Sequence, residues 1–145
     1  MERKWGRAVA GGLAGTLLMT AVGLWIAPMM GIPRMNPAAM LAGAMGGRAA
    51  LGWVGYLMIG VVLALINAIA SPHLPGPPAA RGALYGLFPW IVATIAVMPM
   101  MGMGVFGGSA VPAIGGLIGH LVYGATLGSV YGQPDPAAHD RPVHA

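Results

Sequence analysis

Two stretches with the same spacing of small residues decide the predicted fold. Gly116-Leu117-Ile118-Gly119-His120-Leu121-Val122-Tyr123-Gly124 lies in the last apolar segment of the chain. Gly52-Trp53-Val54-Gly55-Tyr56-Leu57-Met58-Ile59-Gly60 lies in the second, and Tyr56 stands where His120 stands. Self-similarity of this kind is the sequence signature of a repeated structural unit.

Two further matches lie upstream of these stretches. Pro28-Met29-Met30-Gly31 corresponds to Pro99-Met100-Met101-Gly102, and Gly11-x-x-x-Gly15 corresponds to Gly82-x-x-x-Gly86. We therefore predict a duplicated helical hairpin. Because each copy crosses the membrane twice, the copies share one orientation and are related by a pseudo-two-fold axis along the membrane normal.

The composition predicts an all-α polytopic membrane protein. The chain is 57% hydrophobic and only 7% charged, whereas soluble domains carry about 25% charged residues. Several apolar runs exceed the roughly 18 residues that mark a membrane span. The predicted organisation is a basic N-terminus (1–7), a first hairpin (8–70) with an interfacial helix (37–45) in its loop, a Pro-rich loop (71–81), a second hairpin (82–131) and a flexible tail (132–145).

The charges predict the orientation and exclude nucleic acid as a partner. Arg3, Lys4, Arg7, Arg81 and Arg141 fall on the side of both termini, and Arg34 and Arg48 fall on the other. The positive-inside rule then places both termini in the cytoplasm, with the chain in a bacterial inner membrane. The net charge is only +4, without a basic run that could follow a phosphate backbone.

Small-residue stripes predict how the helices pack, since burial of apolar surface does not drive helices together in lipid. We expect spans two and four to meet near the pseudo-axis, which would bring Tyr56 close to His120. The predicted packing glycines are Gly11, Gly15, Gly52, Gly60, Gly82, Gly86, Gly116, Gly124 and Gly128.

His120 is the candidate functional residue, because ionisable groups within spans are costly and raise a functional hypothesis. It could be a neutral packing residue bonded to Tyr56 or to a carbonyl, a haem ligand or a proton relay. Tyr56 and His120 are the candidate cofactor-binding pair. The candidate cofactors are haem and copper, and the sequence does not decide between them.

The surplus of methionine suggests a second candidate site. Thioethers select Cu(I), although methionine also serves as adaptable packing. By the repeat, two methionine groups share the outer membrane edge. The candidate copper ligands are Met29, Met30, Met100, Met101 and Met103.

Missing residue types argue against an enzyme. The chain has no cysteine, and its acids are Glu2, Asp135 and Asp140, all near the ends. Paired carboxylates or a Ser–His–Asp set cannot be built in the spans. We therefore expect a non-catalytic membrane protein, either an accessory subunit of a larger membrane complex or a homo-oligomer. The alternatives are a haem or copper module and a passive conduit for a small solute.

The chain resembles a group of small bacterial inner-membrane proteins with four spans. The resemblance rests on Gly52-Trp53-Val54-Gly55-Tyr56, on Gly86-Leu87-Phe88-Pro89-Trp90 and on His120-x-x-x-Gly124-x-x-x-Gly128, within residues 8–131. Relatives carry histidine where this chain has Tyr56. The resemblance implies a four-span architecture and no particular reaction.

Overall fold

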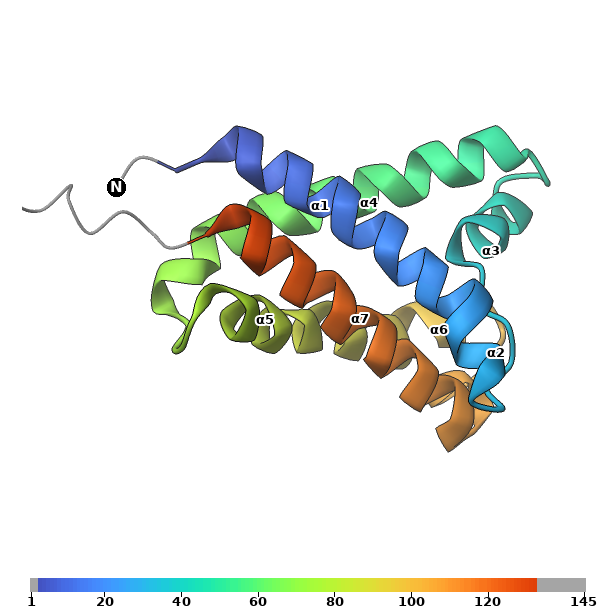
Figure 1. Ribbon diagram of the computed structural model, residues 1–145. Helices are drawn as coiled ribbons and strands as arrows, with labels where there is room; N and C mark the ends of the chain where they lie inside the picture. Colours follow the sequence, from blue (N-terminus) through green and yellow to red (C-terminus); the bar gives the residue numbers. More distant parts are fainter. Residues whose placement is uncertain (1–2, 133–145) are drawn as a thin grey trace, which may run out of the picture.

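The fold is built from four long helices joined by short helical segments (Figure 1). The computed structural model describes residues 3–132, and this part of the chain contains no strand. The predicted flexible tail lies, from residue 133 onward, outside the described residues. The α-helices are α1 (Trp5–Ala21), α2 (Ala27–Met29), α3 (Pro37–Ala44), α4 (Ala49–Ala70), α5 (Pro78–Val92), α6 (Met98–Met100) and α7 (Ala110–Tyr131).

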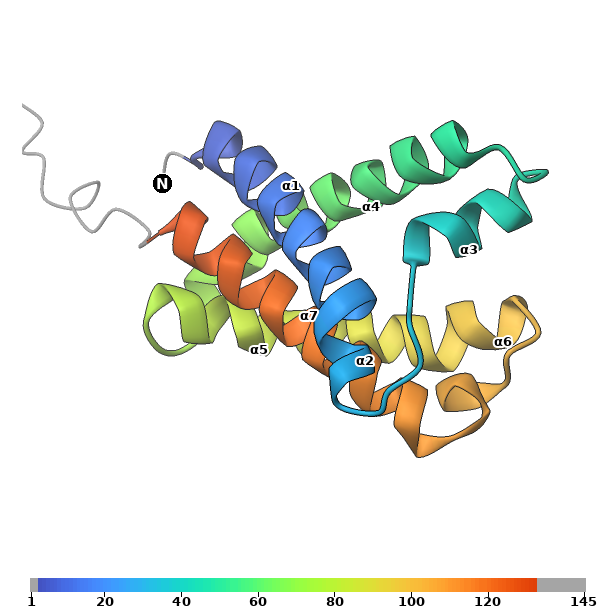
Figure 2. The ribbon, with the colours of Figure 1, turned by 45° about the vertical axis from the view of Figure 1, so that its right-hand side comes forward.

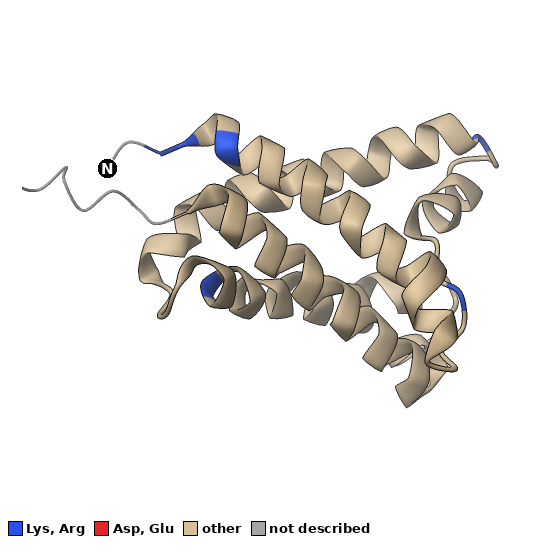
Figure 3. Ribbon diagram, viewed as in Figure 1, with Lys and Arg blue, Asp and Glu red and all other residues tan. Residues whose placement is uncertain are grey.

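Four helical stretches are long and apolar enough to cross a membrane. Trp5–Met29, Ala49–His73, Pro78–Met100 and Ala110–Tyr131 have mean hydropathies of 1.8, 2.3, 1.7 and 1.4. Within residues 3–132, Lys and Arg lie only toward the two ends of the bundle (Figure 3). The uncharged middle fits the apolar core of a bilayer, where a charged side chain is costly.

Two π-helical segments interrupt the first and third spans. Val22–Ile26 joins α1 to α2, and Ala93–Val97 joins α5 to α6. Pro28 and Pro99 follow the two segments at the same distance. A proline lacks the N–H donor and collides with the carbonyl four residues before it, and a π-bulge gives the backbone the room to accommodate this. The α-helix continues through Pro89, so the irregularity of span three falls after it.

The helices are ordered α4, α1, α7, α5 across the bundle, with α1 and α7 in the middle (Figures 1 and 2). The expectation that spans two and four pack directly along a central seam was therefore wrong. The stripe of α7 faces α5, where Gly124 and Gly128 meet Gly82. α1 lies between α7 and α4 and packs against both helices.

The closest helix contacts are made by glycines. A Cβ built on Gly82 would lie 2.8 Å from the backbone nitrogen and Cα of Gly128. A Cβ built on Gly15 would lie 2.9 Å from the ring of Tyr123. Only glycine permits such approach, which strengthens dispersion contacts between the helices.

Tyrosine hydroxyls link the helices across the bundle. Tyr123 donates to the carbonyl of Gly60 at 2.6 Å, and Tyr85 donates to the carbonyl of Leu63 at 2.7 Å. Each phenol thereby satisfies its polar group in an apolar surrounding, where an unbonded hydroxyl is costly. Both bonds reach α4, one of the two outer helices of the bundle, and attach it to α7 and α5.

The connection between α1 and α4 contains the predicted short helix. Asn36 caps α3, its side chain accepting a hydrogen bond from the backbone N–H of Ala39 at 3.0 Å. A Cβ built on Gly52 of α4 would lie 2.8 Å from the nitrogen of Ala42 in α3. Gly52 therefore allows α3 to pack closely against α4. α3 covers one end of the bundle, which is called the α3 end below (Figure 2).

Candidate functional site

His120 is held in one orientation by its own helix. Its Nδ1 lies 2.7 Å from the carbonyl oxygen of Gly116, one turn earlier in α7. A carbonyl oxygen only accepts, so a neutral His120 carries its proton on Nδ1 and presents the lone pair of Nε2. The predicted bond to a carbonyl is present, and the alternative bond to Tyr56 is not seen.

Tyr56 is positioned by Thr20 of α1 and Trp53 of its own helix. Its hydroxyl oxygen lies 3.4 Å from Oγ1 of Thr20, and its ring meets Trp53 edge-on with centroids 6.3 Å apart. Thr20 bonds the carbonyl of Thr16 at 2.8 Å, which uses its single hydrogen. The phenolic hydrogen of Tyr56 is therefore the one available for the Thr20 contact or for a bound molecule.

Tyr56 and His120 line one cavity of about 470 Å³. This volume is typical of small-molecule sites. α4 and α5, which diverge toward the α3 end (Figure 2), both contribute to the cavity lining. Its walls are largely apolar, with contributions from every long helix and from α3. They include Met19, Met35, Met40, Met98, Met101, Met103, Leu41, Tyr56, Ile59, Leu63, Ile66, Phe88, Val92, Ala93, Val97 and His120.

The mouth of the cavity faces the surface that the bilayer would cover. Ile59 of α4 is 49% exposed and Phe88 of α5 is 52% exposed, and both line the cavity. Apolar side chains at the rim leave no polar barrier between the cavity and lipid. An apolar molecule could therefore enter sideways from the membrane. A second hollow of about 520 Å³ near Trp90 and Phe106 contains no titratable side chain.

The structure separates the five predicted copper ligands into two groups. Met101 and Met103 line the cavity. Met29, Met30 and Met100 are 84%, 61% and 86% exposed and do not line it. The sequence identified the methionine-rich edge, and which methionines turn inward depends on the turns after α2 and α6.

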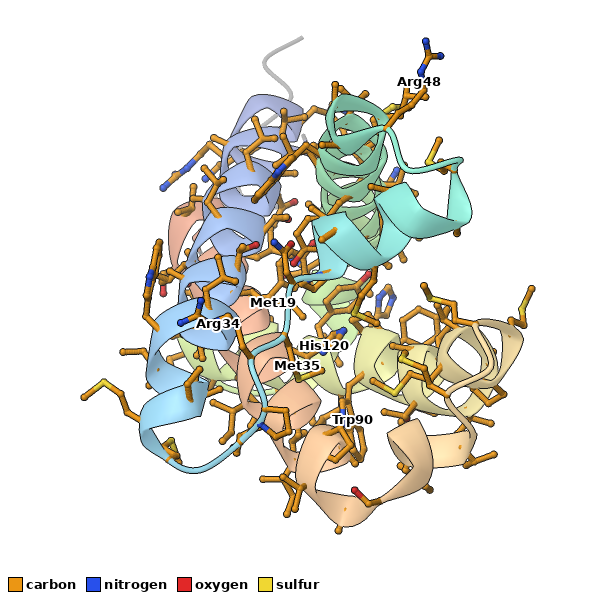
Figure 4. The ribbon with its side chains drawn as sticks, turned by 90° about the vertical axis from the view of Figure 1, so that its right-hand side faces the viewer. Met19, Arg34, Met35, Arg48, Trp90 and His120 are labelled. Atoms are coloured by element: carbon orange, nitrogen blue, oxygen red, sulfur yellow. The ribbon has the colours of Figure 1, made fainter. Side chains whose placement is uncertain are left out.

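Met19 is one of the cavity residues that sequence reasoning missed. It lies in the last turn of α1, four residues after Gly15, and lines the cavity together with His120. The signal was available, because four-residue spacing places Met19 on the same helix face as the packing glycine Gly15. Figure 4 shows Met19, Met35 and His120 together near the middle of the bundle, viewed from the α3 end.

All nine predicted packing glycines are buried within the chain. Gly11 and Gly15 pack against α7, Gly52 packs against α3, and Gly60 packs against Thr16 of α1. Gly116 is the loosest, since a Cβ there would lie 3.7 Å from the nearest atoms of Trp90.

The described residues hold no group of three or more His, Cys, Asp and Glu side chains that could bind a metal ion. Residues 3–132 also contain neither Asp nor Glu. The donors of the cavity are therefore one imidazole, one phenol and thioethers. This set suits apolar ligands, neutral hydrogen-bonding groups and soft metals.

These features define a four-span, all-helical integral membrane protein with a lateral, methionine-rich cavity. The chain belongs to a family of unknown function (DUF6789), whose model matches residues 2–140. Searches of curated proteins and of solved structures find no match.

Proposed function

We propose that this protein is a non-catalytic membrane protein that binds a small, largely apolar molecule taken from the bilayer. The observation that carries the proposal is the cavity of about 470 Å³ that contains His120 and Tyr56 and has an apolar rim facing lipid. A cavity of this size and lining buries most of a small ligand and leaves a few polar groups to orient it.

The polar groups of the cavity determine which polar group the ligand carries. Nε2 of His120 can accept a hydrogen bond, because Nδ1 is the nitrogen that bonds Gly116. A hydroxyl or N–H on an otherwise apolar body would satisfy Nε2, and an oxygen could accept from Tyr56. The ligand class is therefore a membrane-soluble alcohol, phenol or amide. Haem held by His120 is a separate candidate ligand, which would use Nε2 to coordinate iron.

The test uses two alanines of the same π-helical segment. Ala93 lines the cavity, whereas Ala96 is exposed and does not. Ala93→Phe should fill the cavity, and Ala96→Phe is the matched control that adds the same ring toward lipid. Organic extracts of the purified proteins are analysed by mass spectrometry after extensive detergent exchange, and an absorption spectrum detects haem.

We expect the wild type and Ala96→Phe to retain a stoichiometric apolar compound that Ala93→Phe has lost. Far-UV circular dichroism confirms that both variants are folded. Wild-type protein without any retained compound, or equal retention in the two variants, would contradict the proposal.

We further propose the orientation that the charges predict, with both termini in the cytoplasm of a bacterial cell. The starts of α1 and α5, with Arg3, Lys4, Arg7 and Arg81, lie beside the end of α7. Arg34 and Arg48 lie in the segments before and after α3 (Figure 4). This asymmetry supports the placement under the positive-inside rule. Reactivity of single cysteines at positions 3 and 48 with an impermeant maleimide tests it, since the chain has no cysteine of its own.

We also infer that the two hairpins arose by duplication. The turns after α2 and α6 support this, because Gly31 bonds the carbonyl of Pro28 at 3.1 Å and Gly102 bonds that of Pro99 at 3.0 Å. Gly31 and Gly102 have φ values of +78° and +77°. Assembly into a larger complex stays a prediction, since the stripes that motivated it are buried inside the chain.

A further inference from the structure

Two methionines approach the helix of His120 from different parts of the chain. Met19 comes from α1, and its Cγ lies 3.2 Å from the position that a Cβ on Gly119 would take. Met35 comes from the loop before α3, and its Sδ lies 3.3 Å from the corresponding position on Gly115. Both thioethers therefore reach α7 within one turn of His120, and all three residues line the same cavity (Figure 4).

The absence of side chains on Gly115 and Gly119 makes this approach feasible. A methyl group on Gly119 would meet Met19 at 3.2 Å, and one on Gly115 would meet Ile32 at 2.7 Å. The two glycines leave the face of α7 beside His120 open for the long side chains of Met19 and Met35.

His120 supplies a nitrogen ligand, Nε2, to the cavity that Met19 and Met35 line. The bond from Nδ1 to Gly116 fixes the tautomer, so the lone pair of Nε2 is the one that can coordinate a metal. The carbonyl of Gly116 acts as the outer partner that orients a metal-binding imidazole.

The lack of charge on these three ligands determines which metal ions they can bind. Thioethers and a neutral imidazole carry no charge, and residues 3–132 contain no carboxylate or thiolate that could compensate a cation. The cost of moving an ion into an apolar medium rises with the square of its charge, so a monovalent ion is strongly preferred over a divalent one. Thioethers independently select Cu(I).

We propose that Met19, Met35 and Nε2 of His120 form a binding site for one soft monovalent metal ion, Cu(I), on the α1–α7 wall of the cavity. The ion and the proposed apolar ligand would both use the lone pair of Nε2, so the titration uses protein from which any retained compound has been removed. The proposed site differs from the copper site predicted from the sequence. Its sulfur ligands are two methionines that line the cavity, in place of the exposed Met29, Met30 and Met100. Met98, Met101 and Met103 line the same cavity and supply further thioethers.

The test measures binding of Ag(I), a redox-inert substitute for Cu(I), to purified protein in dodecyl maltoside by isothermal titration calorimetry. Bound silver is counted by mass spectrometry after desalting, and Zn²⁺ serves as the divalent comparison. The site variant is Met19→Leu combined with Met35→Leu, which keeps side-chain volume and removes both sulfurs. The matched control is Met29→Leu combined with Met100→Leu, which removes two exposed sulfurs. His120→Leu tests the nitrogen donor.

We expect wild type and control to bind one Ag(I) per chain and no Zn²⁺, and the site variant and His120→Leu to bind Ag(I) at least tenfold more weakly. Circular dichroism checks that each variant is folded. Absence of stoichiometric silver in the wild type, or equal affinity of the site variant and the wild type, would overturn the proposal. Retention of the apolar compound is measured separately, so failure of the metal site leaves the ligand proposal standing.

Discussion

Replacement of Gly124 by alanine tests the packing of α5 against α7. A Cβ at this position would lie 2.8 Å from the carbonyl carbon of Gly82 and 3.1 Å from the nitrogen of Gly86. The carbonyl oxygen of Gly82 is closer still. Ordinary Cβ contacts begin at 3.4 Å. The helices would therefore have to separate by more than about 0.6 Å at this point, because backbone atoms cannot rotate away as a side chain can.

Gly116→Ala is the matched control on the same helix. A Cβ on Gly116 would lie 3.7 Å from the side chain of Trp90, which is ordinary contact. Both changes occur inside α7, so the gain in helix propensity of about 1 kcal/mol is common to them and cancels in the comparison. Overpacking costs about 1–3 kcal/mol. We therefore expect Gly124→Ala to be less stable than Gly116→Ala by about 1–3 kcal/mol.

The assay is unfolding by sodium dodecyl sulfate in mixed micelles, followed by far-UV circular dichroism. The free energies of unfolding of the two variants are compared at one mole fraction of the denaturing detergent. Equal stability of the variants, or a lower stability of Gly116→Ala, would refute the assignment of α5 as the partner of Gly124.

Three further substitutions test the contacts that fix the remaining elements. Tyr123→Phe removes the 2.6 Å bond to the carbonyl of Gly60, and the same unfolding assay should show a loss of about 0.6–1.7 kcal/mol; no loss would mean that the bond does not hold α4. Asn36→Ala removes the cap of α3, which is worth about 1 kcal/mol, so hydrogen exchange should accelerate across α3 alone. Arg7→Gln removes the 2.9 Å hydrogen bond to the carbonyl of Val130 and the cation at the end of α7. Hydrogen exchange in the last turn of α7 should therefore accelerate. Unchanged hydrogen exchange would count against this role of Arg7.

The sequence predicted the helices well because the physics that defines them is local. Asn36-Pro37 marks the start of α3 by side-chain capping and a fixed φ, and the helix begins there. Four spans follow from the length of the apolar runs. Gly82 and Gly124, two glycines of the predicted stripes, lie in a close backbone contact between α5 and α7.

The neighbour of each stripe could not be predicted in the same way. A row of glycines defines a face that permits close approach, and the opposing helix depends on the size of the side chains beside that row. α7 packs against α5 and α1 and reaches α4 through the hydrogen bond of Tyr123 to Gly60. The cavity depends on the same long-range packing, together with the docking of α3 on Gly52.

Photocrosslinking of a diazirine-bearing fatty alcohol in lipid nanodiscs tests the central claim most directly, namely that the cavity takes up an apolar molecule from the bilayer. Met98 lines the cavity and is only 8% exposed, whereas Leu17 is 54% exposed. The account predicts adducts at Met98 that Ala93→Phe abolishes, while adducts at Leu17 stay unchanged. Labelling confined to Leu17 and other outward residues, or labelling of Met98 that Ala93→Phe leaves intact, would contradict it.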